Sequence, residues 1–111
     1  MTSEDLKDIL SDHLLTLLYF STPACNVCKV LRPKVETLLS EEPPWHFQYI
    51  NTEESMEIAG QNLIFTVPTL LLMAEGREIT RLSRHFGMHE LEAPVRRYAQ
   101  LFNQFPEESG G

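Results

Sequence analysis

The chain has 111 residues, enough for one compact domain with a core that needs neither disulfide staples nor a structural metal. Hydrophobic residues make up 42% and charged residues 23%, as in an ordinary globular protein. The 16 acidic and 9 basic residues give a net charge of -7. We therefore expect no nucleic-acid or anionic-membrane partner, because such surfaces select clustered Lys and Arg.

The first residues predict a capped helix rather than a secretory signal. Residues 1–8 are acidic, whereas a signal begins with basic residues followed by a long apolar stretch. Thr2 with Asp5 three residues later is a capping-box pattern. The longest apolar run, residues 14–20, is far shorter than the roughly 18 residues of a membrane span. We therefore expect a cytoplasmic protein.

The next segments predict a strand, a helix and a second strand. Residues 14–20 are almost continuously apolar, as in a strand that is covered on both faces. The polar segment 21–24 ends this strand, and the helix after it carries one apolar stripe. The stripe consists of Cys28, Leu31, Val35 and Leu38. Residues 45–49 alternate between aromatic and polar, so the unit predicts two parallel strands joined by a helix.

The second half of the chain predicts a short helix and an antiparallel hairpin. Residues 53–60 form the short polar helix, and residues 67–73 are a second apolar strand. A turn at 74–77 leads into residues 78–83, which mix apolar and basic side chains as an edge strand does.

A last helix completes a predicted α/β domain, in which a mixed sheet of about four strands has helices on both faces. The apolar stripe of this helix comprises Leu91, Val95, Tyr98, Phe102 and Phe105. We expect Pro94 in the opening turns of this helix, where its missing N–H costs little if it is near the first helical position. Residues 1–106 are assigned to a single domain, and residues 107–111 to a frayed tail without an apolar anchor.

The only two cysteines, Cys25 and Cys28, are separated by two residues. Cys25 stands where the strand passes into the helix, so free N–H groups and the helix dipole favour its thiolate. Cys28 lies one turn further on the apolar stripe, where burial raises its pKa. We expect Cys25 to act as the nucleophile and Cys28 as the resolving thiol. Three basic side chains should add positive charge near the pair. These are Lys29, Arg32 and Lys34.

Two cysteines at this spacing are also half of a four-ligand metal site. The chain has no other cysteine, and neither His46 nor the pair His85 and His89 has finger-type spacing. We therefore expect no metal, and histidines on the surface.

A second motif, residues 66–69 (Thr-Val-Pro-Thr), opens the third strand, where a proline avoids losing a ladder hydrogen bond. Together with the order strand, helix, strand, helix, hairpin and helix, this motif makes the chain resemble the thioredoxin family along nearly its full length. Cys25 and Cys28 match the redox-active pair, and Lys29 matches the base that commonly follows it. Pro33 matches the proline that kinks the family's active-site helix.

The resemblance implies roles for the residues that open the third strand. Val67, Pro68 and Thr69 match the Ile/Val-Pro-Thr signature, so we expect Pro68 to be cis and to lie against the disulfide. Val67 would pair with an extended substrate segment as an added strand. The family also implies no cofactor beyond the Cys25–Cys28 disulfide, and a reductase or a low-molecular-weight thiol as electron donor.

Two departures from the family are visible. Thioredoxins proper carry Trp-Cys-Gly-Pro-Cys, whereas residues 24–28 read Ala-Cys-Asn-Val-Cys, which lacks the tryptophan of the binding face. Six residues before its first cysteine the family buries an aspartate that serves proton transfer. Here that residue is Tyr19, whose ordinary pKa near 10 makes it a poor base at neutral pH.

Three functional hypotheses follow. The first is an enzyme that uses both cysteines to reduce protein disulfides in cell redox homeostasis. We favour this hypothesis and expect the protein to be a monomer. The second is a glutaredoxin-like enzyme that reduces mixed disulfides with a low-molecular-weight thiol and needs Cys25 alone. The third is a non-enzymatic adaptor whose cysteines are vestigial or bind metal as a dimer.

Overall fold

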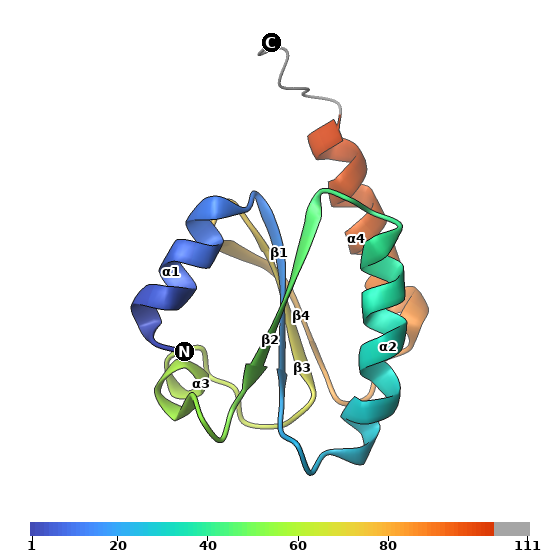
Figure 1. Cartoon of the computed structure of the whole chain (residues 1–111). Helices are drawn as coiled ribbons and strands as arrows, with labels where there is room; N and C mark the ends of the chain where they lie inside the picture. The colour runs from blue at the N-terminus through green and yellow to red at the C-terminus, as the bar shows by residue number, and fades with distance from the viewer. Residues whose placement is uncertain (104–111) are drawn as a thin grey trace.

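The computed structural model describes residues 1–103, which form a four-stranded sheet with two helices on each face. Figure 1 shows α1 and α3 on one side of the sheet and α2 and α4 on the other. The elements are α1 (Ser3–Asp12), β1 (Leu15–Ser21), α2 (Asn26–Ser40), β2 (Trp45–Asn51), α3 (Met56–Gln61), β3 (Thr69–Ala74), β4 (Arg77–Ser83) and α4 (Met88–Asn103). The predicted architecture is therefore confirmed.

The sheet has the strand order β2-β1-β3-β4. β1 pairs in parallel with β2, with Leu15 opposite Trp45, and antiparallel with β3. β3 and β4 form the expected antiparallel hairpin. Every residue of β1 and β3 is buried, whereas β4 at the edge is at least partly exposed throughout. The continuous apolar runs therefore became the two central strands.

The alternation of side chains along β1 divides the core into two layers. Leu17 and Tyr19 pack toward α2 and α4, whereas Leu18 and Phe20 pack toward α1 and α3. All four side chains are fully buried. The period of two of an extended strand produces this division, because successive side chains point to opposite faces of the sheet.

The start of α1 has the predicted capping box. The Asp5 N–H donates to Thr2 Oγ1 at 3.1 Å, and the Thr2 N–H donates to Asp5 Oδ2 at 2.9 Å. The hydrogen bond from the Thr2 backbone is the main cause that lowers the pKa of Asp5. Within residues 1–103, no helix combines the length and the apolar character that crossing a membrane would need.

One predicted helix boundary was wrong. α3 begins at Met56 rather than at residue 53, because Asn51 draws the chain into a turn by accepting the Glu53 N–H on Oδ1 at 2.9 Å. α4 begins at Met88, where Glu90 accepts the Gly87 N–H at 2.9 Å. Pro94 therefore lies inside α4, six residues after Met88.

Other expectations differ from the structure in smaller ways. The three strands predicted at 14–20, 67–73 and 78–83 begin at residues 15, 69 and 77. His46 is half-buried because its ring stacks on that of His13, with centroids 3.8 Å apart. Burial and then His13 lower the pKa of His46. Phe105 and the tail at 107–111 lie outside the described residues.

Candidate active site: the Cys25–Cys28 disulfide

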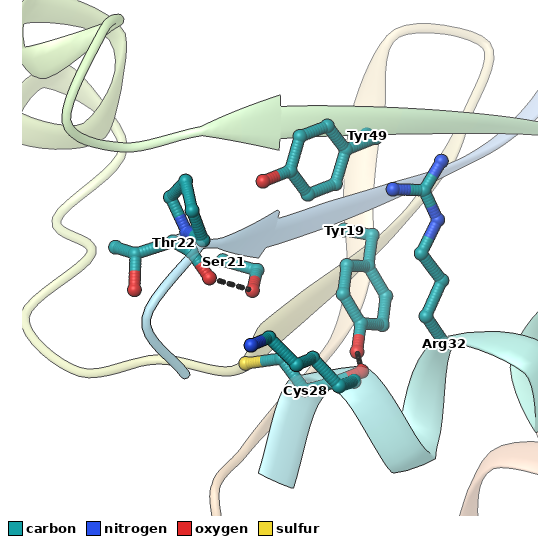
Figure 2. Close-up of a pocket in the computed structure, with 8 residues that line it drawn as sticks. Tyr19, Ser21, Thr22, Cys28, Arg32 and Tyr49 are labelled. Carbon is teal, nitrogen blue, oxygen red and sulfur yellow. Dashed lines mark hydrogen bonds between the residues drawn. The ribbon is translucent and has the colours of Figure 1, made fainter. Parts of the chain in front are cut away.

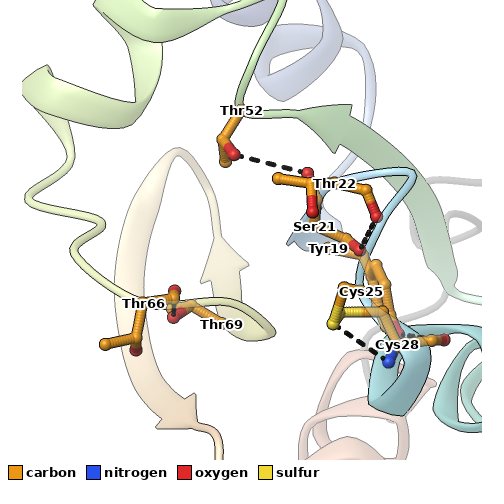
Figure 3. The surroundings of a disulfide bond; sticks show 8 residues. All are labelled: Tyr19, Ser21, Thr22, Cys25, Cys28, Thr52, Thr66 and Thr69. Carbon is orange, nitrogen blue, oxygen red and sulfur yellow. Dashed lines mark hydrogen bonds between the residues drawn. A yellow bond between two sulfur atoms is a disulfide. The ribbon is translucent and has the colours of Figure 1, made fainter.

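The two cysteines form a disulfide where β1 passes into α2, with their Cα atoms 5.3 Å apart (Figure 3). Cys25 is the N-cap of α2, and its Sγ accepts the Cys28 N–H at 3.2 Å. An N-cap side chain satisfies one of the free N–H groups of the first turn, and a negative charge there gains most from them. This location therefore favours a thiolate at Cys25 once the disulfide is reduced.

The two cysteines differ in exposure. Cys28 is only 3% exposed and belongs to the core layer that also contains Val35. Cys25 is half-buried at the margin of that layer. A substrate approaching from solvent therefore meets Cys25 before Cys28.

Tyr19 lies beneath the disulfide and is completely buried. Its hydroxyl donates to the carbonyl oxygen of Cys28 at 2.9 Å. Burial raises the pKa of Tyr19 to about 12. At neutral pH the hydroxyl therefore keeps its proton and anchors the first turn of α2 through this hydrogen bond.

A cavity of about 160 Å³ reaches Cys28 from the side of β2 (Figure 2). It is lined by Tyr19, Ser21, Thr22, Pro23, Cys28, Lys29, Arg32 and Tyr49. Within the described part of the chain, no carboxylate or histidine is among its lining residues. The charged side chains among these lining residues, Lys29 and Arg32, are therefore both cations, in a protein whose net charge is -7.

Of the two cations in this wall, Arg32 is engaged by its neighbours. Its Nε lies 3.2 Å from a carboxylate oxygen of Glu36. Its guanidinium carbon lies 4.5 Å from the ring centroid of Tyr49 and 5.4 Å from that of Phe47. Such a position over aromatic faces is favourable for a guanidinium. Arg32 therefore covers the aromatic side chains between α2 and β2, and Lys29 is the less constrained cation.

Pro33 and Lys34 lie further along α2. Together with Met88 and Glu92 they line a separate cavity between α2 and α4. The expectation that Lys34 adds charge beside the cysteines was therefore wrong, because the rotation of the helix carries it toward α4. Pro33 is inside α2, where it supplies no N–H to the carbonyl of Lys29.

The Val67–Pro68 peptide bond is cis, which is the geometry that the family resemblance implies. Thr69 Oγ1 donates to the Thr66 carbonyl at 2.7 Å, and the Arg84 N–H donates to the Pro68 carbonyl at 2.9 Å. Val67 packs against the same core layer as Cys25. Thr66 and Thr69 are among the residues that surround the disulfide (Figure 3). The predicted motif therefore lies at the site.

The sequence reasoning missed a groove on this side of the molecule. A cavity of about 220 Å³ is lined by Thr22, Thr52, Ile64, Phe65, Thr66 and Val67. Phe65 is 83% exposed, which is unusual for a phenylalanine. The signal in the sequence was the apolar triplet 63–65 directly before the Val-Pro-Thr motif, which no strand or helix period explains.

Among residues 1–103, no three side chains of Cys, His, Asp or Glu are grouped closely enough to hold an ion. The arrangement at the disulfide is instead one that supports thiol chemistry, with one sulfur at a helix N-terminus and the other behind it.

A Tyr19→Phe variant is expected to lose about 1 kcal/mol of unfolding free energy, because only the hydrogen bond to Cys28 is removed. The pH dependence of the thiol reaction between about pH 6 and 9 should not change, because the pKa of Tyr19 is about 12. Urea unfolding and the pH profile of thiol alkylation measure the two effects.

The stability of the unmodified protein and of Tyr19→Phe at alkaline pH tests whether Tyr19 keeps its proton in the folded state. The folded pKa of Tyr19 lies above the ordinary value of 10, so the protonated hydroxyl favours the folded state. Its contribution is complete below about pH 10 and is lost as the pH rises toward about 12. The Tyr19→Phe variant should not show this decrease in stability at alkaline pH, because phenylalanine has no proton to lose. A shift of the thiol profile near neutral pH would contradict the assignment.

Comparison with known proteins agrees with this geometry. Residues 1–97 match the family described as Thioredoxin. A thioredoxin-like protein of Bacillus subtilis, YdfQ, is 31% identical over 97 residues, which cover 87% of each chain. Thioredoxin-1 of Saccharomyces cerevisiae is 25% identical over 81 residues, covering 73% of this chain and 79% of that protein.

The fold comparison leads to the same family. A mutant thioredoxin from Halobacterium salinarum superimposes with a TM-score of 0.79 at 28% identity, covering 87% of this chain and 85% of that one. The chain therefore belongs to the thioredoxin family and, with its Cys25–Cys28 pair, is a thiol-disulfide oxidoreductase.

Proposed function

We propose that the chain reduces disulfides in protein substrates, with Cys25 as the attacking thiolate and Cys28 as the resolving thiol. One observation supports this most strongly. The half-buried Cys25 caps α2 and receives the N–H of Cys28, whereas Cys28 itself is 3% exposed. Cys25 therefore has the more accessible sulfur at a site that favours its thiolate, as an attacking thiol requires, and the Cys28 sulfur is shielded, as a resolving thiol requires.

The reaction begins with the reduced protein. The Cys25 thiolate attacks one sulfur of the substrate disulfide, that bond breaks, and the other substrate sulfur leaves and takes a proton. Cys28 then loses its proton and attacks the sulfur of Cys25. The mixed disulfide breaks, the second substrate thiol is released, and the Cys25–Cys28 disulfide forms. A reductase or a low-molecular-weight thiol must return two electrons before the next turnover.

The neighbouring side chains support these steps. Lys29 stabilises the thiolates by its charge, since it lines the cavity that reaches Cys28. The proton of Cys28 leaves to water in that cavity, because the lining residues that the structure describes include no carboxylate or histidine to accept it. Pro68 and Thr69 shape the opposite side, and Val67 offers its backbone to an extended substrate segment. We place the protein in the cytoplasm as a monomer.

One observation also favours a second function, the reduction of mixed disulfides with a low-molecular-weight thiol. The cavity at Cys28 is small, at about 160 Å³, and Lys29 and Arg32 would complement a carboxylate on such a thiol. This function needs Cys25 but not Cys28, so the two functions predict different behaviour of a Cys28→Ser variant.

The first test is catalysed reduction of a protein disulfide such as that of insulin, together with a redox titration of the Cys25–Cys28 pair. We expect acceleration over the dithiol reductant alone and a potential near the ~-270 mV of thioredoxin. Each ~30 mV corresponds to about 1.4 kcal/mol in this two-electron couple. A protein without reductase activity, whose two thiols react at equal slow rates, would not support the proposal.

A further inference from the structure

A side chain from the edge strand β4 holds the loop that precedes the cis proline. Arg81 donates from Nη1 to the Leu63 carbonyl at 3.1 Å and from Nη2 to the Asn62 carbonyl at 2.9 Å. The same guanidinium makes two hydrogen bonds of 2.9 Å to the carboxylate of Glu78. A planar guanidinium suits this task because its donors lie in a fixed fork. We call these contacts the Glu78–Arg81 clamp.

The clamp acts where the backbone of the loop is unusual. Leu63 has a φ of 57°, in the left-handed region that residues with a side chain rarely adopt. Its own side chain is 60% exposed, so burial contributes little to holding it there. Such a conformation persists only when the surrounding contacts impose it. Besides the clamp, two backbone hydrogen bonds cap the end of α3 here, from the Leu63 N–H to the Gly60 carbonyl at 3.1 Å and from the Ile64 N–H to the Ala59 carbonyl at 2.9 Å. The clamp adds side-chain hydrogen bonds from β4 to this capped turn.

Two residues after the clamp, the loop presents Phe65 to solvent. Phe65 lines the groove of about 220 Å³ together with Ile64, Val67 and Thr22. Thr22 also lines the cavity at Cys28, and its carbonyl accepts the Cys25 N–H at 3.2 Å. The groove therefore adjoins the loop that carries the disulfide.

The lining of the groove indicates what it can hold. Its described lining residues contain threonine hydroxyls and apolar side chains, and none is charged. A charged group entering the groove would lose water without gaining an ionic partner, whereas an apolar group gains by leaving water. The chemistry of the groove thus selects an apolar side chain.

We propose that Arg81 is a positioning residue, which with Glu78 holds residues 63–67 so that Phe65 forms one wall of a subsite beside the disulfide. The subsite receives an apolar side chain of the polypeptide that carries the substrate disulfide. Arg81 does not touch the substrate and acts only through the loop. This inference rests on the proposed reduction of protein disulfides, and it adds a preference among such substrates.

The test compares two substrates in each protein variant. One is a peptide disulfide with leucine beside the cysteine, and the other is the disulfide of 2-mercaptoethanol, which has no polypeptide to enter the groove. We expect Arg81→Met to lower the ratio of the two kcat/KM values about tenfold, with the change in KM for the peptide. The ratio cancels any difference in the fraction of folded protein.

Phe65→Ala is the second variant, because it removes the wall of the subsite and leaves the clamp intact. It should lower the same ratio by about the same factor, and the double variant should lower it little further, since both changes affect one contact. When the peptide carries aspartate in place of leucine, the ratio of the two kcat/KM values should differ little between the variants and the unmodified protein.

Arg96→Met is the matched control. Arg96 also makes two ion pairs, at 2.8 Å to Glu42 and 3.3 Å to Glu41, but at the C-terminal end of α2, away from the disulfide. Its ratio should equal that of the unmodified protein. An unchanged ratio in Arg81→Met or in Phe65→Ala would overturn the inference. Failure of the unmodified protein to reduce the peptide disulfide would instead overturn the proposed function.

Discussion

A Cys28→Ser variant is expected to stop after the first half of the reaction and to remain joined to its substrate through Cys25. The serine hydroxyl cannot displace the mixed disulfide, and Cys28 is the only other cysteine of the chain. Non-reducing electrophoresis and intact mass should show one substrate per protein, released by dithiothreitol. Steady-state reduction of a protein disulfide should be lost.

A Cys25→Ser variant should form no such adduct and should not turn over. The remaining thiol, Cys28, is 3% exposed and lies behind the N-cap position. The variant lacking both cysteines is the control for noncovalent association. Sustained turnover of Cys28→Ser on a small mixed disulfide would favour the second function. An adduct in Cys25→Ser equal to that in Cys28→Ser would contradict the assigned roles.

A Phe20→Ala variant is expected to lose about 3–5 kcal/mol of unfolding free energy. Phe20 is fully buried in the central strand β1 and packs in the layer that contains Leu6 of α1 and Ile58 of α3. Removing the ring takes away its burial and leaves a cavity that the neighbouring strands cannot close. Since small domains have about 5–15 kcal/mol in total, the variant should be close to unfolding.

Urea unfolding followed by circular dichroism measures this loss as a lower midpoint with an unchanged slope. Leu14→Ala is the control, because Leu14 immediately precedes β1 but is 59% exposed, so we expect a change within about 0.5 kcal/mol. The redox potential of the folded Phe20→Ala protein should not change, because Cys28 packs in the other core layer. Similar losses in the two variants would contradict this account of the core.

The elements and the position of the disulfide were predictable because their signals are local. The apolar runs that became β1 and β3 are each contained within a few residues, and so is the capping box of Thr2. The place of Cys25 at the start of α2 follows from the strand before it and the helical stripe after it. The cis geometry of Pro68, in contrast, was expected only from the family resemblance.

The errors came from contacts that a periodic pattern does not contain. The pattern predicts a short helix from residue 53, but the Asn51 side chain holds a turn there and α3 begins at Met56. Lys34 is close to Cys28 along the chain, but the turn of α2 directs it to α4. The stacking of His13 on His46 joins α1 to β2, and neither segment alone indicates it.

By itself, the sequence determined the order of strands and helices and the chemical difference between Cys25 and Cys28. Both depend on hydrogen bonds and side-chain periods that span only a few residues. Only the tertiary structure decided what surrounds the sulfurs. The Tyr19 hydroxyl meets the Cys28 carbonyl, and Arg81 meets the loop before Pro68, because the sheet brings these segments together across long stretches of chain.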